Sequence, residues 1–153
     1  MMSTKKSGTI GLTAVAIAVV LAGCGTAQAP EEPSPATVRP VAGSPIPQLQ
    51  LTDQAIRRLG VATQPVRMAT VTIASRRGPE KVIPYSAVIY DNDGSTWTYV
   101  NTAPRTFTRE RIAVLVIRGS VAILGRGPAA GSPVVTVGAP ELLGTEYDIS
   151  GEE

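Results

Sequence analysis

The sequence has no histidine and only one cysteine, Cys24, among its 153 residues. Without histidine the chain lacks the side chain that serves most often as a general base and as a metal ligand. A single cysteine excludes a disulfide within the chain. Lys81, Tyr85 and Ser86 lie close together in sequence, but their spacing is more typical of turn and surface positions than of a catalytic group. The composition therefore predicts no enzyme and no cofactor.

Long apolar runs are also lacking. The N-terminal run Ile10–Leu21 has 12 residues, whereas a helix needs about 20 to cross a bilayer. Lys5 and Lys6 precede this run, and a short apolar segment behind basic residues is typical of a secretion signal. We therefore predict a signal peptide over residues 1–23 rather than a retained membrane span.

The only cysteine follows this run directly. Leu21, Ala22 and Gly23 precede Cys24, and the four residues resemble the bacterial lipobox, in which a slim, extended segment is recognised by the signal peptidase. The resemblance implies that Cys24 carries the lipid and begins the mature chain. A buried core cysteine is the alternative, but the Ala-, Pro- and Ser-rich residues that follow offer no core. We expect a lipoprotein held by its acyl chains at the cell membrane, on the extracytoplasmic side.

Neither sign of charge is in excess once the predicted signal is removed. The sequence has 14 basic and 12 acidic residues, and loss of Lys5 and Lys6 leaves 12 of each. A near-neutral mature chain gives no indication of a nucleic-acid partner. The last 13 residues nevertheless contain five acids and no base. We predict a disordered acidic end at residues 150–153. For the acidic tail from Glu146 to Glu153 we favour disorder over the alternative that it caps the basic face of a neighbouring protein.

Proline is distributed unevenly along the chain. Six of the 13 prolines lie between Gly25 and Pro47, among Ala, Ser, Thr and Glu residues. We interpret residues 24–47 as a lipidated linker that holds a folded domain away from the membrane. The folded domain is then predicted over residues 48–149, which is enough chain for one small domain.

This segment has the pattern of an all-β domain with one short helix. Thr52 suits the N-cap of a two-turn helix, and Gly60 suits the left-handed position after its end. Further along, runs rich in β-branched residues alternate with turns such as Asp91–Gly94 and Arg76–Pro79. Because aromatic residues make up only 4% of the sequence, we expect an aliphatic core in a small β-barrel-like domain. The predicted strands are Val66–Ala74, Lys81–Ile83, Ser86–Tyr90, Thr96–Thr102, Thr106–Arg118, Val121–Leu124 and Val134–Val137.

Four segments of this domain resemble one known domain in their order and spacing. They are Ile83–Asp91 (IPYSAVIYD), Thr96–Val100 (TWTYV), Phe107–Arg109 (FTR) and Gly131–Gly144 (GSPVVTVGAPELLG). Together they resemble the membrane-proximal C-terminal domain of periplasmic adaptor (membrane fusion protein) subunits of resistance-nodulation-division efflux pumps. The likeness covers roughly residues 80–147. The β-barrel, lipoyl-like and helical-hairpin parts of a full adaptor have no counterpart here.

The resemblance implies a binding role. In this family the membrane-proximal domain docks on the periplasmic part of the inner-membrane efflux transporter. We therefore expect a membrane-anchored accessory subunit in transmembrane export. Arginine and aromatic residues are strong interface anchors, although arginines also protect a solvated edge strand from pairing. The candidate partner contacts are Trp97, Tyr99, Arg105, Phe107, Arg109 and Arg111.

Other functions are compatible with the same pattern. A stand-alone envelope lipoprotein with a ligand-binding or structural role, and no transporter, is the second hypothesis. A homo-oligomer is compatible with either function. Some adaptors of this family pass copper or silver through methionines, but only Met68 would remain after processing, so we expect no metal site. Asp91–Gly94 resembles a calcium loop only superficially, because Thr96 and Thr102 occupy the positions of its glycine and its glutamate.

Overall fold

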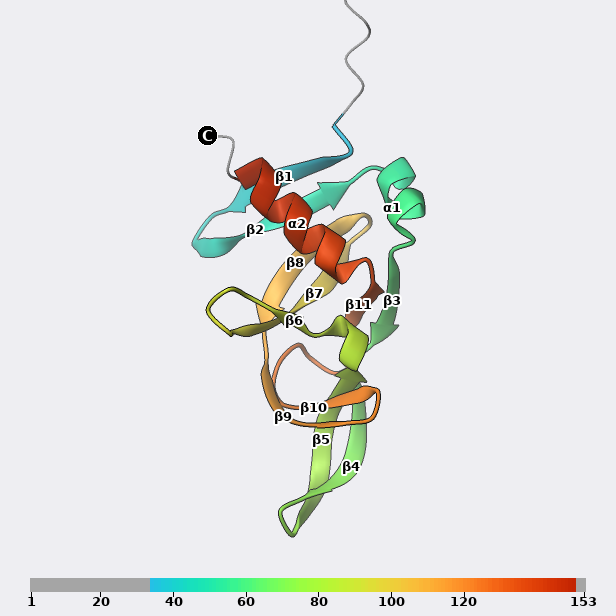
Figure 1. Cartoon of the computed structure of the whole chain (residues 1–153), viewed down its shortest axis with the longest axis vertical. Coiled ribbons are helices and arrows are strands. Elements are labelled where there is room, and N and C mark those ends of the chain that lie inside the picture. The colour runs from blue at the N-terminus through green and yellow to red at the C-terminus, as the bar shows by residue number, and fades with distance from the viewer. Residues whose placement is uncertain (1–33, 151–153) are drawn as a thin grey trace, which may run out of the picture. The chain divides into compact units, whose positions relative to one another are not determined.

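Two β-sheets and two short helices form the part of the chain that the structure describes, residues 34–150 (Figure 1). The structure is a computed structural model. The small all-β domain predicted from the sequence is confirmed. Its strands form two open sheets rather than a closed barrel.

The larger sheet contains most of the strands, and the main core packs against one of its faces. Its order is β1-β2-β8-β7-β11-β3, and β6 also pairs with β7. Every pairing is antiparallel. Its strands are β1 (Ala36–Val41), β2 (Ser44–Leu51), β3 (Ala62–Pro65), β6 (Ile89–Tyr90), β7 (Thr96–Ala103), β8 (Thr106–Arg111) and β11 (Pro133–Val137).

The smaller sheet has four strands in the order β4-β5-β10-β9. It lies at the end of the described unit opposite the β1–β2 hairpin (Figure 1). The Arg118 guanidinium donates a hydrogen bond to the carbonyl oxygen of Thr72, and these residues belong to the two edge strands. The sheet is therefore curled, so that its edges approach each other. Its strands are β4 (Arg67–Ile73), β5 (Arg76–Pro84), β9 (Ala113–Arg118) and β10 (Val121–Arg126).

The chain passes between the two sheets four times, and two of these passages consist of a single buried residue. Val66 separates β3 from β4, and Ile112 separates β8 from β9; their side chains are 2% and 3% exposed. The Ile112 amide donates to the carbonyl of Thr96 at 2.9 Å, and the Val66 amide donates to the carbonyl of Ser132 at 2.9 Å. The continuous strand predicted over Thr106–Arg118 is therefore wrong, because the chain turns where Ile112 is buried in a second core. This second core is built from Val66, Ile83, Ala87, Val100, Ile112, Ala122, Leu124 and Val134.

Two helices cover one face of the larger sheet. Helix α1 (Asp53–Leu59) has the predicted caps: the Thr52 hydroxyl accepts from the Ala55 amide at 3.1 Å, and Gly60 has a φ of 63°. Helix α2 (Ala139–Ser150) crosses the sheet, as Figure 1 shows. The main core lies between these helices and the sheet. It is built from Ala36, Leu49, Leu51, Ala55, Ile89, Tyr99, Phe107, Val135, Ala139 and Leu142.

The predicted linker over residues 24–47 is wrong in its second half, and the domain does not begin at residue 48. β1 and β2 form a hairpin there. Side chains alternate between the two faces of each strand, and this places Ala36 and Leu49 in the core. Their burial stabilises the hairpin in spite of the high proline content. Pro40 lies at a register shift on an edge strand, where a missing amide costs no ladder hydrogen bond.

Two turns also differ from the prediction. The β4–β5 turn lies at Ala74 and Ser75, which have φ values of 44° and 70°, and Arg76–Pro79 belongs to β5 instead. Pro79 is tolerated because β10 pairs with β5 only from Lys81 onward. The predicted strand Ser86–Tyr90 begins as the 3-10 turn η1 (Tyr85–Ala87), and only β6 is extended.

The acidic C-terminal segment is ordered where the structure describes it. Residues 139–150 form α2, and Glu146 is 3% exposed. Pro140 near the N-terminus and Glu141 in the first turn favour helix initiation. Leu142 and Glu146, four residues apart, lie on one helix face. The disorder expected from Glu146 onward is therefore wrong through residue 150, and residues 151–153 lie outside the described part.

Candidate functional site

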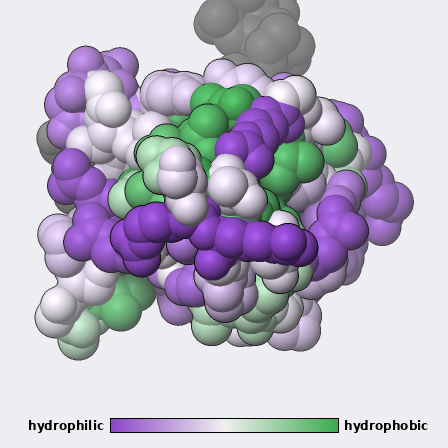
Figure 2. Space-filling view, turned by 90° about the horizontal axis from the view of Figure 1, so that it is seen from below, coloured by the Kyte–Doolittle hydropathy of each residue, from purple (hydrophilic) through white to green (hydrophobic). Residues whose placement is uncertain are grey.

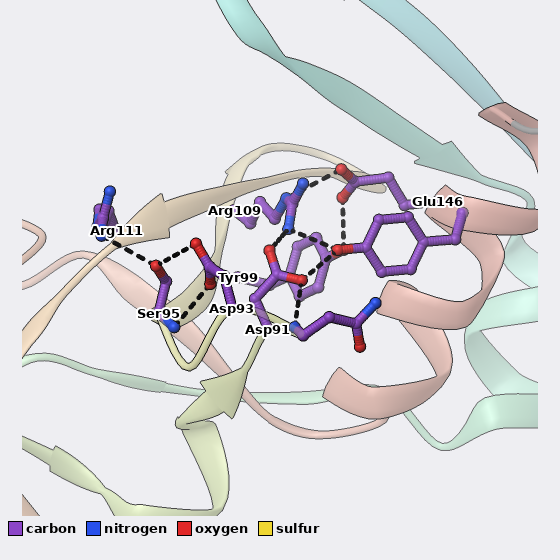
Figure 3. A network of polar contacts seen from close by, with 9 residues as sticks. Asp91, Asp93, Ser95, Tyr99, Arg109, Arg111 and Glu146 are labelled. Carbon is purple, nitrogen blue, oxygen red and sulfur yellow. Dashed lines mark hydrogen bonds and ion pairs between the residues drawn. The ribbon is translucent and has the colours of Figure 1, made fainter.

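Arg109 is the centre of a polar network between α2 and the larger sheet (Figure 3). Its Nη1 atom lies 3.0 Å from Oδ2 of Asp91, and its Nε atom lies 3.0 Å from Oε1 of Glu146. The Nε contact is an ion pair without hydrogen-bond alignment. These three side chains come from β8, from the loop after β6 and from α2, so the network joins three separate segments. Burial is the largest single effect and by itself lowers the pKa of the Arg109 guanidinium. The negative charge of Glu146 and the contacts with Tyr147 and Asp91 together outweigh burial, so the pKa is raised.

Tyr99 completes the buried side of this network. Its hydroxyl donates to Oε2 of Glu146 at 2.5 Å, and the tyrosine side chain is fully buried. Burial, and next the hydrogen bond to Glu146, raise the pKa of the Tyr99 hydroxyl. Tyr99 therefore stays protonated and keeps donating to the carboxylate.

Asp91 and Tyr147 close the network on its solvent side. The Tyr147 hydroxyl donates to Oδ1 of Asp91 at 2.6 Å, and Arg109 donates to the same hydroxyl at 3.3 Å. The hydrogen bond from Tyr147 and the one from the Asn92 amide lower the pKa of Asp91. The carboxylate is thus held in its charged form, as an acceptor for the guanidinium.

Trp97 lies beneath two arginines. The Cζ atom of Arg109 lies 4.8 Å from the centre of the Trp97 ring, and that of Arg111 lies 5.8 Å from it. Both distances are within the range of a cation–π contact. Arg109 also stacks on Tyr147 at 5.5 Å. These contacts fix the orientation of Arg109 more firmly than its ion pairs alone.

The residues predicted as partner contacts do share a strand face, but that face is covered. Phe107, Arg109 and Arg111 face Asn101, Tyr99 and Trp97 across the β7–β8 ladder. Tyr99 and Phe107 are buried in the main core. Neither is available to a partner in this conformation. The residue pattern of β8 alone does not show that α2 covers this face.

The other predicted contacts differ in their exposure. Arg105 is exposed and pairs with Asp53 at 3.0 Å, whereas the side chain of Arg109 is only 11% exposed. Arg111 is exposed and donates to the Ser95 hydroxyl at 2.9 Å. Trp97 is half-buried beneath the two arginines. Only the arginines at positions 105 and 111 thus remain open to a partner.

The network has the chemistry of a structural clamp. Arg109 forms ion pairs with the carboxylates of Asp91 and Glu146, and the Tyr99 hydroxyl donates a hydrogen bond to Glu146. Nearby, Asp93 accepts hydrogen bonds from the Ser95 amide and hydroxyl, at 2.8 and 2.9 Å, which is the pattern of a hairpin turn. Among residues 34–150 no group of three or more acidic, cysteine or histidine side chains is arranged to hold a metal ion.

Exposed hydrophobic side chains gather around the smaller sheet instead. Figure 2 looks at the described unit from this end and shows hydrophobic residues near the middle of the view, with hydrophilic residues around them. Isolated exposed hydrophobic residues are ordinary, but a cluster at one end indicates an interaction site. We call the exposed hydrophobic residues at this end of the domain the distal surface. They are Tyr85 on η1 and Met68, Leu115, Ile117 and Val121 on the smaller sheet, where Met68 and Ile117 lie on the face opposite to Val121.

A groove of about 480 Å³ adjoins the distal surface. Its floor is apolar, and its polar groups are an arginine, an amide and hydroxyls. Arg67, Gln64, Ser86 and Ser120 make no side-chain hydrogen bond or ion pair with any other described residue. The groove was not predicted from the sequence, because its lining comes from three separate segments. The lining residues are Gln64, Arg67, Val82, Ile83, Pro84, Tyr85, Ser86, Ser120 and Val121.

The predicted lipidation site lies outside the described residues. This applies to Cys24 and to the recognition residues Leu21, Ala22 and Gly23. Within residues 34–150, neither helix has the length and hydropathy required to cross a bilayer.

Comparison with known proteins adds no family to this description. The chain matches no protein-family model, and no curated protein sequence matches it significantly. The likeness of residues 80–147 to efflux adaptors therefore stays a prediction from the sequence.

Proposed function

We propose that this chain is a membrane-anchored lipoprotein whose β-domain binds the extracytoplasmic part of a membrane transporter, as an accessory subunit in export. Cys24 supplies the anchor through its acyl chains. The distal surface supplies the contact with the transporter. The observation that carries the proposal is the concentration of exposed hydrophobic residues at this one end of the domain.

The distribution of these residues favours a protein partner. Within the part of the chain that the structure describes, five of the eight large exposed hydrophobic residues belong to the distal surface, and Leu115 alone is 52% exposed. Burial of apolar area at about 25 cal/mol per Å² is the main favourable term in association. The adaptor resemblance supports a transporter as that partner, because the resembling domain in adaptors is the part that docks.

The position of the anchor is compatible with this contact. The chain enters the described unit at β1, at the end opposite the smaller sheet (Figure 1). Eleven residues lie between Cys24 and Ala36, so the twelve steps of the chain would span roughly 37 Å in polyproline geometry, at about 3.1 Å per residue. A tether of this length keeps the domain near the membrane while leaving the distal surface free for a neighbouring protein.

The proposal is tested by purification from native membranes. The tagged full-length lipoprotein is crosslinked in its own cells, extracted with mild detergent and analysed by mass spectrometry. A multi-span transporter is expected among the crosslinked partners, and a Cys24→Ala variant is expected to leave the membrane fraction and to lose that partner. Recovery of only the chain itself, or of envelope polymers, would instead favour the stand-alone lipoprotein.

A further inference from the structure

The groove beside the distal surface has a specific shape and chemistry. Directly opposed residues of an antiparallel ladder lie on one face of a sheet. The ladder opposes Arg67 to Val82, Val82 to Ile123 and Ile123 to Val116, so these residues share one face of the smaller sheet. Ile123 is only 2% exposed, although its neighbours Ala122 and Leu124 point to the second core on the other side. This face is therefore concave, and it encloses its own apolar residues.

The groove is the inner end of this concave face. Val82 and Pro84 line it from β5, and Val121 lines it from β10, directly opposite Pro84. The hydrogen bond from Arg118 to Thr72 joins the edge strands farther along the sheet. The floor is thus a strip of aliphatic side chains on a fixed sheet.

Arg67 is the charged group of the groove and has no partner in the described part of the chain. Its side chain is exposed and makes no ion pair there, whereas Arg109 and Arg105 are both paired. The amide of Gln64 and the hydroxyls of Ser86 and Ser120 are the other polar groups of the lining. No acidic residue lines the groove. A guanidinium beside neutral donors is suited to bidentate binding of a carboxylate.

The surrounding charge favours an acidic occupant. The smaller sheet contains one acidic residue, Glu80, and six basic residues. Such a surface attracts acidic segments and repels basic ones. Its basic residues are Arg67, Arg76, Arg77, Lys81, Arg118 and Arg126.

The geometry points to a specific occupant for this groove: an acidic side chain flanked by apolar residues, presented by an extracytoplasmic segment of the transporter partner. The carboxylate binds Arg67, and the apolar neighbours pack on Val82, Pro84 and Val121. This inference rests on the proposed function, and it names the chemistry by which the distal surface selects its partner.

The test compares two arginine variants of the full-length lipoprotein in its own membranes. Arg67→Gln is expected to lower the amount of crosslinked transporter at least tenfold. Arg126→Gln removes the same charge from the same sheet but outside the groove, so it is expected to change capture less than twofold. Urea unfolding of both variants shows that the domain remains folded. Equal capture by wild type and Arg67→Gln would overturn the inference while leaving the proposed function intact.

Charge exchange provides a second readout. Once the transporter is identified, single Asp and Glu residues of its extracytoplasmic segments are changed to Arg and combined with Arg67→Glu. Recovery of capture by one such pair is expected, and recovery by none would contradict direct pairing. Absence of any transporter with the wild-type protein would remove the proposed function and this inference together.

A lipid headgroup is the other source of an anion, and it is tested separately. The full-length Cys24→Ala protein is mixed with vesicles of anionic phosphatidylglycerol. The inference predicts no binding that depends on Arg67. Vesicle binding that the Arg67→Gln change abolishes would assign the groove to lipid and overturn the inference.

Discussion

Arg109 of β8 and Glu146 of α2 form an almost fully buried ion pair, with 3.0 Å between Nε and Oε1 and side chains that are 11% and 4% exposed. This pair joins the C-terminal helix to the strand that lies beneath it. Two further contacts, Tyr99 to Glu146 and Asp91 to Arg109, complete the connection. The helix is therefore held by polar contacts as well as by the apolar packing of Leu142.

We expect Glu146→Ala to destabilise the domain by about 3 kcal/mol, because it removes the buried negative charge that pairs with Arg109 and leaves the buried Tyr99 hydroxyl without its acceptor. Glu141→Ala is the matched control, since Glu141 is exposed on the first turn of the same helix. Its loss is expected to cost no more than about 1 kcal/mol, through the helix dipole. Urea unfolding measures both values. A similar loss in the free energy of unfolding for the two variants would contradict a stabilising role of the Arg109–Glu146 network.

The lowered pKa of Asp91 predicts a dependence of stability on pH. A lowered pKa in the folded state means that the stabilisation is present above the unfolded pKa of about 3.9 and is lost as the pH falls through the folded value. We expect Asp91→Asn to be less stable than wild type at pH 7 and to approach it below the pH at which Asp91 protonates. Unfolding midpoints between pH 7 and pH 2 test this. A constant difference over that range would contradict the assignment.

Substitutions in the turn between β4 and β5 are predicted to increase the stability of the domain. Ala74 and Ser75 both have positive φ, a conformation that favours Asn-Gly in a two-residue hairpin. The double change Ala74→Asn and Ser75→Gly is expected to stabilise the domain by about 1 kcal/mol. Thr70→Gly, in the strand that precedes the turn, is expected to destabilise the domain. Thermal unfolding of the two variants distinguishes them, and destabilisation by the turn change would show that the turn has another geometry.

An acidic substitution on the distal surface is expected to prevent partner binding without unfolding the domain. Leu115 is 52% exposed, so Leu115→Asp removes apolar contact area and adds a charge at little cost to folding. Val137→Asp is the control, because Val137 is 51% exposed on β11 of the larger sheet. Capture of the transporter is expected to fall at least tenfold for the first variant only. Equal loss for both would exclude the distal surface as the docking site.

Local signals predicted the parts of the fold that depend on neighbouring residues. The caps of α1 at Thr52 and Gly60, and the strand Thr96–Thr102, were visible because side-chain type and spacing determine them directly. The β1–β2 hairpin was missed because six prolines suggested a linker, although its prolines avoid the paired positions. Helix α2 was missed because Gly144 and the acidic residues lowered its helical signal, while burial of Leu142 and Glu146 stabilises it.

The candidate site could be predicted only in part, for a related reason. Period-two alternation correctly placed Phe107, Arg109 and Arg111 on one face. Whether that face is exposed depends on helix α2, which lies about 30 residues farther along the chain. The alternation of residues within β8 does not predict this contact. The groove at Arg67 is likewise formed by residues of β3 and β4, of β5 and η1, and of the β9–β10 turn, and the pairing of β5 with β4 and with β10 brings these segments together.

Site-specific photo-crosslinking shows which end of the β-domain contacts the transporter. A photoreactive amino acid is placed at position 117, on the distal surface, and in a second protein at position 137, on the larger sheet. Both positions are exposed in the wild type, at 39% and 51%. In native membranes, docking through the distal surface predicts a crosslink to a multi-span transporter from position 117 and none from position 137. A transporter crosslink from position 137 alone, or from neither position, would contradict it.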